Sequence, residues 1–264
     1  MKILILGAGK MGTFFSDLLS RRHRVAVFDI DPDRLRFTYN VERFSSYEEV
    51  RDFAPELVIN AVTLKYTIPA FESVLPHISH NCILSDIASV KTDLPDFYKE
   101  CGHPFVSSHP MFGPTFASLS NLSNENAVVI TEGDSLGQAF FKDLYRQLNL
   151  NVAEYTFEEH DRTVAYSLSI PFAATLAFAG VMKPQKAPGT TFKRHLQIAR
   201  GLMSEDEYLV SEILFNPNTP RKLAGIIEKL SELKDIVECH DSKRMGVFLA
   251  QARENISRQD DTVI

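Results

Sequence analysis

The sequence contains no tryptophan and only three cysteines among its 264 residues. Cys82, Cys101 and Cys239 form no C-x-x-C pair and leave an odd count, which indicates reduced thiols rather than a disulfide framework. His77 and His80 lie close together but lack the further ligands that a zinc or iron site needs. We therefore expect neither disulfides nor a bound metal.

The sequence also lacks an excess of positive charge, with 28 lysine and arginine residues against 34 aspartate and glutamate residues. The formal net charge of -6 argues against nucleic acid or an anionic membrane as the main partner. The longest apolar stretch, around Ile170 to Met182, is too short to span a bilayer, and the amino terminus enters a strand without a leader pattern. With 44% hydrophobic and 23% charged residues, the composition is typical of a soluble domain, and we expect a cytoplasmic protein.

A glycine-rich segment follows the first apolar run. Lys2 to Leu6 fits a buried parallel strand and leads into Gly7-Ala8-Gly9-Lys10-Met11-Gly12, after which apolar residues recur with helical spacing. This is the G-x-G-x-x-G fingerprint in its strand, turn and helix context, where the glycines permit the tight turn, the approach of pyrophosphate and the packing of helix on strand. The N-H groups of the new helix favour an anion. The predicted dinucleotide-binding residues here are Gly7, Gly9, Lys10, Met11 and Gly12.

An acidic residue ends the second predicted strand. Asp29 follows Arg24 to Phe28, about where a ribose-binding carboxylate is expected, roughly 20 residues beyond the glycines. A carboxylate accepts a hydrogen bond from a 2'-hydroxyl and repels a 2'-phosphate, so we predict NAD in preference to NADP. The competing residues are Asp31 and Asp33 for the carboxylate, and Arg34 and Arg36 for a cation that would admit a phosphate.

Strand and helix patterns alternate through the first 155 residues. Leu57 to Val62 reads as a strand that ends at Thr63, Cys82 to Leu84 as a strand before Asp86, and Phe105 to Ser108 as a strand before His109. Such alternation predicts an α/β fold with a largely parallel sheet, whose ligands bind at the carboxyl ends of the strands. We predict a Rossmann-type dinucleotide-binding domain over residues 1–155, with Thr63 and Asp86 among its cofactor-binding residues.

From Phe157 onward only helical patterns are present, which predicts an all-α C-terminal domain over residues 156–264. Apolar faces of this kind commonly exceed what one protomer covers, so we expect this domain to form a homodimer; a monomer with a self-contained bundle is the alternative. The predicted helices are Glu158 to Gly180, Thr191 to Met203, Asp206 to Phe215, Arg221 to His240 and Ser242 to Ile256.

One histidine has a distinctive setting. The segment Ser-Ser-His-Pro-Met-Phe-Gly-Pro places His109 between a predicted strand end and a loop restricted by Pro110, Gly113 and Pro114. An imidazole changes charge near neutral pH, so a restrained imidazole suits a general acid or base. A turn histidine without a chemical role is the alternative interpretation.

Four segments together resemble the successive signatures of prephenate and arogenate dehydrogenases. They are Gly7 to Gly12, Ser85-Asp86-Ile87-Ala88-Ser89-Val90-Lys91, His109 to Pro114, and Glu159-His160-Asp161 with Ala165. The resemblance spans nearly the whole chain, and the histidine loop with Asp-x-x-Ser-Val-Lys is its most specific part. The loop is similar to the dehydrogenase part of bacterial chorismate mutase/prephenate dehydrogenase fusions, and we expect no mutase domain here.

The resemblance implies NAD-dependent oxidative decarboxylation of prephenate to 4-hydroxyphenylpyruvate in tyrosine biosynthesis. His109 matches the family histidine that takes the proton of the substrate hydroxyl, and Ser89 matches the serine that orients this histidine and hydroxyl near the nicotinamide. Lys193 and Arg194 fall near the family arginine that binds the substrate's side-chain carboxylate. Both remain candidates, and a basic surface patch is the alternative.

One segment departs from the family pattern. Leu168-Ser169-Ile170-Pro171-Phe172 stands where many relatives have Ser-His-Leu-Pro-His, so both histidines are missing and Ser169 is the predicted substrate-binding residue there. The contacts to the substrate side chain must therefore differ. Three alternatives stay open: an arogenate dehydrogenase that forms tyrosine, a catalytically weakened regulatory homologue that binds nucleotide, and a different dehydrogenase such as a reductase of imines or 3-hydroxy acids.

Overall fold

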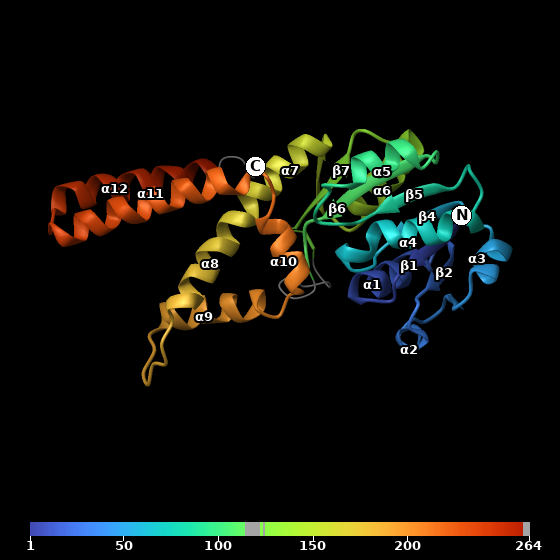
Figure 1. The fold of residues 1–264 in the computed structure, drawn as a ribbon, viewed down its shortest axis with the longest axis horizontal. Helices are drawn as coiled ribbons and strands as arrows, with labels where there is room; N and C mark the ends of the chain where they lie inside the picture. Colours follow the sequence, from blue (N-terminus) through green and yellow to red (C-terminus); the bar gives the residue numbers. More distant parts are fainter. Residues whose placement is uncertain (114–121, 124, 261–264) are drawn as a thin grey trace. The chain divides into compact units, whose positions relative to one another are not determined.

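Eight strands form one sheet in the order β3-β2-β1-β4-β5-β6-β7-β8 (Figure 1). Every neighbouring pair is parallel except β6 and β7, which are antiparallel. The order reverses between β1 and β4, and in such sheets this switch point opens the crevice that binds a dinucleotide. The strands are β1 (Lys2–Leu6), β2 (Arg24–Phe28), β3 (Glu42–Phe44), β4 (Leu57–Asn60), β5 (Ile83–Asp86), β6 (Phe105–Pro110), β7 (Asn126–Ile130) and β8 (Asn151–Tyr155).

The computed structural model describes residues 1–113, 122–123 and 125–260. Pro114, which the sequence places in the histidine loop, lies outside the described residues. Contacts divide the chain into two units, Met1–Asn216 and Pro217–Ile264. The sheet and the helices that precede Pro217 belong to the first unit.

Helices cover both faces of the sheet because successive strand residues point to opposite faces. In β1, Ile3 and Ile5 pack in one core with α1 and α6, whereas Leu4 and Leu6 pack in the other with α3, α4 and α5. The β1 side chains from Ile3 to Leu6 are at most 2% exposed. The elements of this part are α1 (Lys10–Leu19), α2 (Pro32–Leu35), α3 (Tyr47–Phe53), η1 (Leu64–Tyr66), α4 (Thr67–Val74), η2 (Leu75–His77), α5 (Leu94–Glu100) and α6 (Ser135–Gln147).

After β8 the described residues form only helices. In the first unit these are α7 (Phe157–Ser167), α8 (Ser169–Val181), α9 (Thr190–Leu202) and α10 (Glu207–Leu214). The predicted single helix from Glu158 to Gly180 is wrong, since the chain breaks at Leu168 between α7 and α8. Pro171 explains the break, because it has no N-H to bond the carbonyl of Ser167 one turn earlier.

The segment Phe157–Val181 has 25 residues and a mean hydropathy of 1.6 in its apolar window, of which 17% is buried. By length and composition this segment could cross a membrane. The stretch from Ile170 to Met182 was expected to be too short to span a bilayer because that expectation did not include α7, which lengthens the helical segment. The mostly buried core helix of a soluble protein passes the same test. No other helix among the described residues does so.

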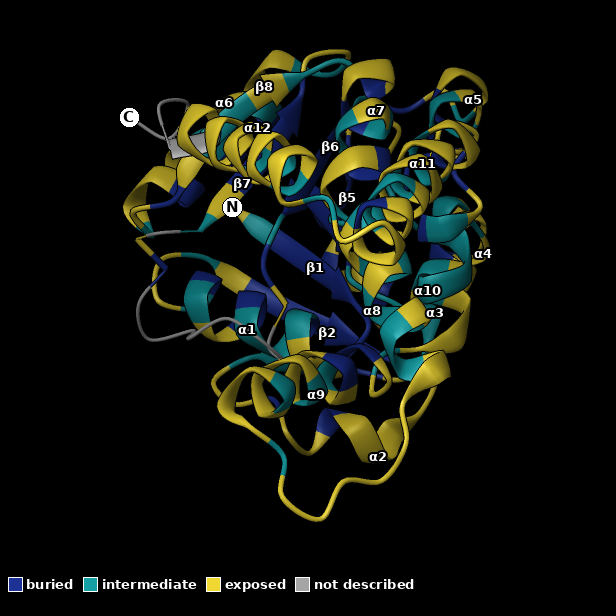
Figure 2. Ribbon diagram, turned by 90° about the vertical axis from the view of Figure 1, so that its left-hand side faces the viewer, coloured by how far each residue is buried: buried dark blue, intermediate teal, exposed yellow. Residues whose placement is uncertain are grey.

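The second unit contains two helices, α11 (Thr219–Glu238) and α12 (Ser242–Asp260), joined by a short turn. Figure 2 shows both as largely exposed, in contrast to the buried strands β1 and β2. The α/β fold class with a helical C-terminal region is confirmed. Although strands give way to helices at Tyr155, the contacts group α7–α10 with the sheet, and a domain boundary at that residue stays a prediction.

Candidate active site

Two glycines of the predicted fingerprint stand where a side chain does not fit. Gly7 follows β1 with a φ of +95°, and a Cβ there would lie 3.1 Å from the backbone of Ala61. A Cβ on Gly12 would lie 1.9 Å from the carbonyl oxygen of Gly7. The loop therefore packs tightly against the end of β4, and α1 packs tightly against the loop.

Gly9 has a different environment, because a Cβ there would meet nothing within 4 Å. It is the N-cap of α1, and no side chain caps the helix at that position. Lys10 and Met11 follow in the first turn, exposed and half-buried respectively. Open space in front of a helix N-terminus fits the pyrophosphate of a dinucleotide, which would accept hydrogen bonds from the backbone N-H groups.

A cavity of about 350 Å³ opens beside this loop. It contains four of the predicted cofactor-binding residues, Gly7, Gly9, Asp29 and Thr63. Tyr47, Tyr66, Pro69 and Ala70 add ring and apolar surface that suits a nucleoside. The lining does not include Lys10, Met11, Gly12 or Asp86.

The carboxylate of Asp29 is fixed by the backbone on both sides. One oxygen accepts from the N-H of Ala8 at 2.7 Å, and the other accepts from the N-H of Asp31 at 2.9 Å. The cavity also contains Arg34, whose guanidinium lies 3.5 Å from the carboxylate of Asp31. The residues present thus fit a dinucleotide, with an acidic group placed for a ribose diol and one arginine beside it.

His109 lies at the carboxyl end of β6, paired with Val128 of β7. The predicted strand ended at Ser108, but β6 continues to Pro110 and holds the imidazole in a regular ladder rather than in a loop. The residue is 6% exposed, and its Nδ1 lies 3.0 Å from Nε2 of His160 on α7. Burial, with the nearby His160 and Lys91, holds the pKa of His109 well below the ordinary value of 6.5, so the imidazole is neutral at neutral pH.

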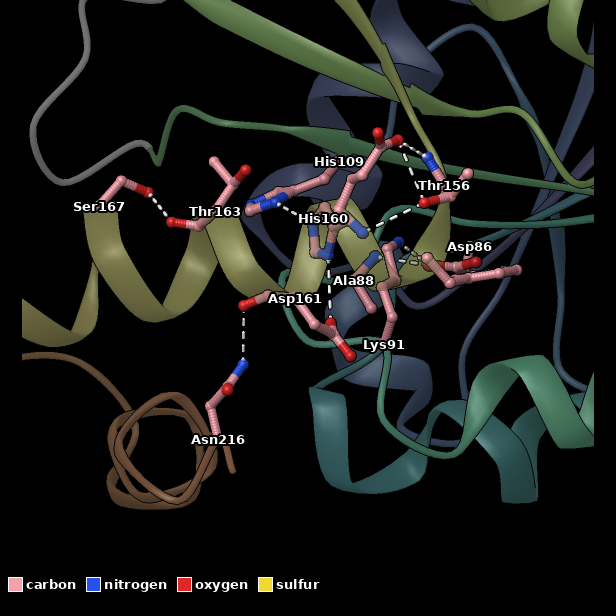
Figure 3. Close-up of polar contacts among 12 residues, drawn as sticks. Asp86, Ala88, Lys91, His109, Thr156, His160, Asp161, Thr163, Ser167 and Asn216 are labelled. Carbon is pink, nitrogen blue, oxygen red and sulfur yellow. Dashed lines mark hydrogen bonds and ion pairs between the residues drawn. The ribbon is translucent and has the colours of Figure 1, made fainter. Parts of the chain in front are cut away.

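Lys91 and Asp86 form a buried ion pair next to the histidines (Figure 3). The ammonium of Lys91 also donates to the carbonyl of Ser108 at 2.7 Å, and the hydroxyl of Tyr98 donates to Asp86 at 2.8 Å. Both charged side chains have 0% exposure. Asp86, a predicted cofactor-binding residue, is therefore occupied in holding a buried cation.

The other predicted residues lie in diverse environments. Ser89 is half-buried in the loop between β5 and α5, and among the described residues the bonded partner of His109 is His160 rather than Ser89. Ser169 is fully buried, and its hydroxyl donates to the carbonyl of Ile213 at 2.8 Å. Lys193 and Arg194 are exposed on α9.

His160, Asp161 and Lys91 belong to the sequence motifs but were not predicted as site residues. His160 is 51 positions from His109 in the sequence, and no local sequence pattern indicates that α7 brings the two rings into contact. The usable signal was the motif Glu159-His160-Asp161 at the start of a helix. Within the described part of the chain, no group of three or more His, Cys, Asp or Glu residues is arranged to hold a metal ion.

Comparison with known proteins identifies the family. Residues 18–155, more than half of the chain, match the model of the prephenate dehydrogenase nucleotide-binding domain. The chain is 23% identical over 222 residues to the probable arogenate/prephenate dehydrogenase of Methanocaldococcus jannaschii, covering 77% of this chain and 48% of that protein. It is 23% identical over 250 residues to the T-protein of Haemophilus influenzae, covering 89% and 60%. The chain thus spans about half to three fifths of the length of these relatives.

Solved structures share the fold. The prephenate dehydrogenase of A. aeolicus, in complex with hydroxyphenyl propionate and NAD+, superposes with a TM-score of 0.80 at 19% identity, covering 98% of both chains. Synechocystis arogenate dehydrogenase superposes with a TM-score of 0.76 at 18% identity, and the match covers 98% of this chain and 100% of that chain. With the family model matched over more than half of its length, the chain belongs to the prephenate and arogenate dehydrogenase family.

Proposed function

We propose that this protein catalyses the NAD-dependent oxidative decarboxylation of prephenate to 4-hydroxyphenylpyruvate. The observation that carries the proposal is His109, a buried and neutral imidazole at the same sheet edge as the glycine-rich loop. Among the described residues only its Nδ1 is hydrogen-bonded, which leaves Nε2 to a substrate. A general base needs this combination of a fixed ring and an unprotonated nitrogen.

The chemistry assigns His109 a defined role. A bound nicotinamide supplies the hydride acceptor. As hydride leaves the ring carbon that bears the hydroxyl, Nε2 of His109 accepts the hydroxyl proton and a carbonyl forms. Carbon dioxide then leaves the opposite ring carbon, its bonding electrons make the ring aromatic, and the proton returns to the same oxygen as the phenol hydroxyl. The reaction releases no net proton, so His109 is neutral again after each turnover.

Ser89 and the basic residues of α9 complete the proposed site. Ser89, half-buried in the loop after β5, would orient the substrate hydroxyl toward the imidazole. Lys193 or Arg194 would bind the side-chain carboxylate, arginine with two parallel hydrogen bonds and lysine as a point charge. We also propose Ser169 as a substrate-binding residue from its place at the start of α8, where its hydroxyl donates to the carbonyl of Ile213.

Arogenate is the second candidate substrate, because one observation favours it. Ser169 and Phe172 stand at the start of α8 where many relatives have histidines, so these positions offer no imidazole to the keto acid side chain of prephenate. The relatives carry both names: one is a probable arogenate/prephenate dehydrogenase, and Synechocystis arogenate dehydrogenase shares the fold.

The carboxylate of Asp29 supports NAD as the cofactor, because it would accept from a ribose hydroxyl and repel a 2'-phosphate. The complex of A. aeolicus prephenate dehydrogenase with NAD+ agrees with this choice. We further propose that the protein is cytoplasmic and forms a homodimer through its helical region, since α8 is strongly apolar and only its Ser169 is buried.

A direct assay tests the proposal. The purified protein is mixed with NAD and either prephenate or arogenate, and NADH and the aromatic product are measured. We expect NADH and 4-hydroxyphenylpyruvate in equal amounts, with a higher kcat/KM for prephenate. A higher kcat/KM for arogenate, with tyrosine as product, would establish the second candidate. NAD binding without turnover of either substrate would contradict the proposal and favour a regulatory homologue.

A further inference from the structure

Two buried imidazoles are in contact at the centre of the site. The rings of His109 and His160 meet edge to face, with centroids 5.2 Å apart and planes at 63°. Nδ1 of His109 faces Nε2 of His160 at 3.0 Å, and Nδ1 of His160 faces a carboxylate oxygen of Asp161 at 3.4 Å (Figure 3). The exposed fractions of the side chains of His160 and Asp161 are 1% and 28%. The chain of contacts therefore runs from the buried base to an acid that reaches solvent.

The direction of these hydrogen bonds follows from Asp161, the last group in this series of contacts. A carboxylate only accepts, so Nδ1 of His160 must carry the hydrogen that points to Asp161. Burial lowers the pKa of His160, and a neutral imidazole carries one hydrogen, so its Nε2 has a lone pair. His109 must then donate from Nδ1, which leaves its own lone pair on Nε2.

We propose that His160 and Asp161 are positioning residues that hold His109 in the tautomer whose Nε2 is free to accept a proton. The proposal rests on the function proposed above, because it concerns the base of that reaction. It adds a requirement that the reaction alone does not impose: the carboxylate must act on His109 through a second histidine.

The groups that face this pair support the assignment. Lys91, from the loop after β5, places a buried ammonium near both rings and opposes a second proton on either imidazole. Asp86 on β5 is held by Lys91 and by Tyr98. Asp161 is thus the carboxylate that contacts the histidine pair. Because both rings are neutral and the carboxylate of Asp161 only accepts, His109 must donate to His160 and His160 must donate to Asp161.

The start of α7 fixes His160 in place. Thr156 and Glu159 form a capping box, and the N-H of His160 donates to the carbonyl of Thr156 at 2.9 Å. The side-chain amide of Asn216 donates to the carbonyl of Asp161 at 3.0 Å. A base held by a capped helix keeps its orientation while the substrate binds.

Nitrogen-15 NMR of histidine-labelled full-length protein tests the tautomers without substrate. Signals are assigned by their loss in His109→Asn and His160→Gln. We expect both rings to carry hydrogen on Nδ1 at neutral pH. In Asp161→Asn the new amide can donate to His160 through its NH2 group, so the Nε2-H form should become populated in both rings. Hydrogen on Nε2 of His109 in the unmodified protein, or no switch in Asp161→Asn, would overturn the proposal.

Kinetics supply the second measurement. In Asp161→Asn, kcat should fall by about 10²-fold or more with KM near normal, because loss of a carboxylate that fixes a catalytic tautomer costs up to about 10⁴-fold. Asp161→Glu, which restores a carboxylate, should recover most of the loss. The matched control is His103→Gln, since His103 is also buried but contacts the carbonyl of Cys82 instead.

The two measurements separate the possible failures. If the unmodified protein turns over neither substrate, the proposed function fails while the NMR spectra still decide the tautomers. An Asp161→Asn variant with normal kcat and switched tautomers would show that His109 is not the base. Equal losses in Asp161→Asn and Asp161→Glu, with unchanged tautomers in both, would assign Asp161 a purely structural role and contradict the proposal.

Discussion

Lys91 and Asp86 form an ion pair in which neither side chain is exposed to solvent. The carboxylate accepts two further hydrogen bonds, from the hydroxyl of Tyr98 at 2.8 Å and from the N-H of Ala88 at 3.1 Å. Burial lowers the pKa of Lys91, and the contact with Asp86 opposes that effect. The pair thus keeps a cation inside the protein, close to the histidines of the site.

Asp86→Asn should destabilise the fold strongly. It leaves the ammonium of Lys91 buried without a counter-charge, and breaking a buried pair in this way costs about 3–5 kcal/mol. The double variant Asp86→Asn/Lys91→Met should recover much of the loss, since neither charge is then left alone. Urea unfolding of the three proteins measures this, and equal stability of the single variant and the parent would show that the pair contributes little.

Gly12→Ala and Gly9→Ala form a matched pair that separates packing from cofactor binding. A Cβ on Gly12 would overlap the carbonyl of Gly7, so we expect a loss of about 1–3 kcal/mol in the free energy of unfolding together with weaker binding of NAD. A Cβ on Gly9 points into open space, so Gly9→Ala should lose less than about 1 kcal/mol. If pyrophosphate approaches this position, the variant should nevertheless bind NAD more weakly in a calorimetric titration. Normal NAD binding by Gly9→Ala would place the pyrophosphate elsewhere.

The sheet could be predicted because its signals are local. Lys2–Leu6 and Gly7 to Gly12 specify a strand, a turn and a helix within a dozen neighbours, and β2 occurs at the predicted residues Arg24 to Phe28. The break at Leu168 was missed because Pro171 is the third residue of α8, a position that a first helical turn tolerates.

The site was less predictable, because its contacts join distant segments. His109 was identified from its setting between serines and prolines, but its partner His160 comes from α7 after two further strands and a helix. The motif that ends at Lys91 does not indicate burial of this residue, and only the packing of β5, β6 and α5 makes it a buried cation. Asp86 lies at a strand end, as predicted, but no sequence pattern indicated that Lys91 and Tyr98 donate hydrogen bonds to its carboxylate oxygens.

Cofactor choice should depend on Asp29. Asp29→Asn removes the charge that repels a 2'-phosphate, so affinity for NADP should rise relative to NAD. The control is Asp31→Asn, since Asp31 also lines the cavity but contacts Arg34. Titration of each protein with both cofactors decides: a selectivity change in the Asp31 variant alone would transfer the role to that residue, and tight binding of NADP by the parent would remove the argument.

The apolar surface of α8 should be shared between protomers. Ala174, Ala177 and Val181 are exposed along one side of the helix, at a spacing of three and four residues. Sedimentation should show a dimer at micromolar concentration, and Ala177→Arg should dissociate it by burying a charge in the contact. Glu158→Arg, an exposed change on α7, is the control and should stay dimeric. A monomeric parent protein would contradict the shared surface.

Acid should affect both stability and activity through His109. Its pKa is lowered in the folded state, so below about pH 6.5 the unfolded chain takes up a proton that the folded protein excludes. Stability is therefore lost as pH falls from that value toward the lowered pKa. For the same reason the base stays unprotonated, and the acid limb of kcat/KM should lie below the ordinary histidine value. If kcat/KM begins to fall at pH 6.5 or above, a group other than His109 limits the rate.

His109→Asn tests the base itself. The introduced amide still bonds the substrate hydroxyl but cannot accept its proton, so kcat should fall by about 10² to 10⁴-fold, the usual contribution of general base catalysis, while substrate binding stays near normal. The variant should also lose less stability on acidification, because it lacks one of the two buried imidazoles. His103→Asn is the control, since that histidine is buried outside the pair. If kcat of the His109 variant stays close to that of the parent while its acid stability improves as expected, His109 is a structural residue and the hydroxyl proton goes to another group.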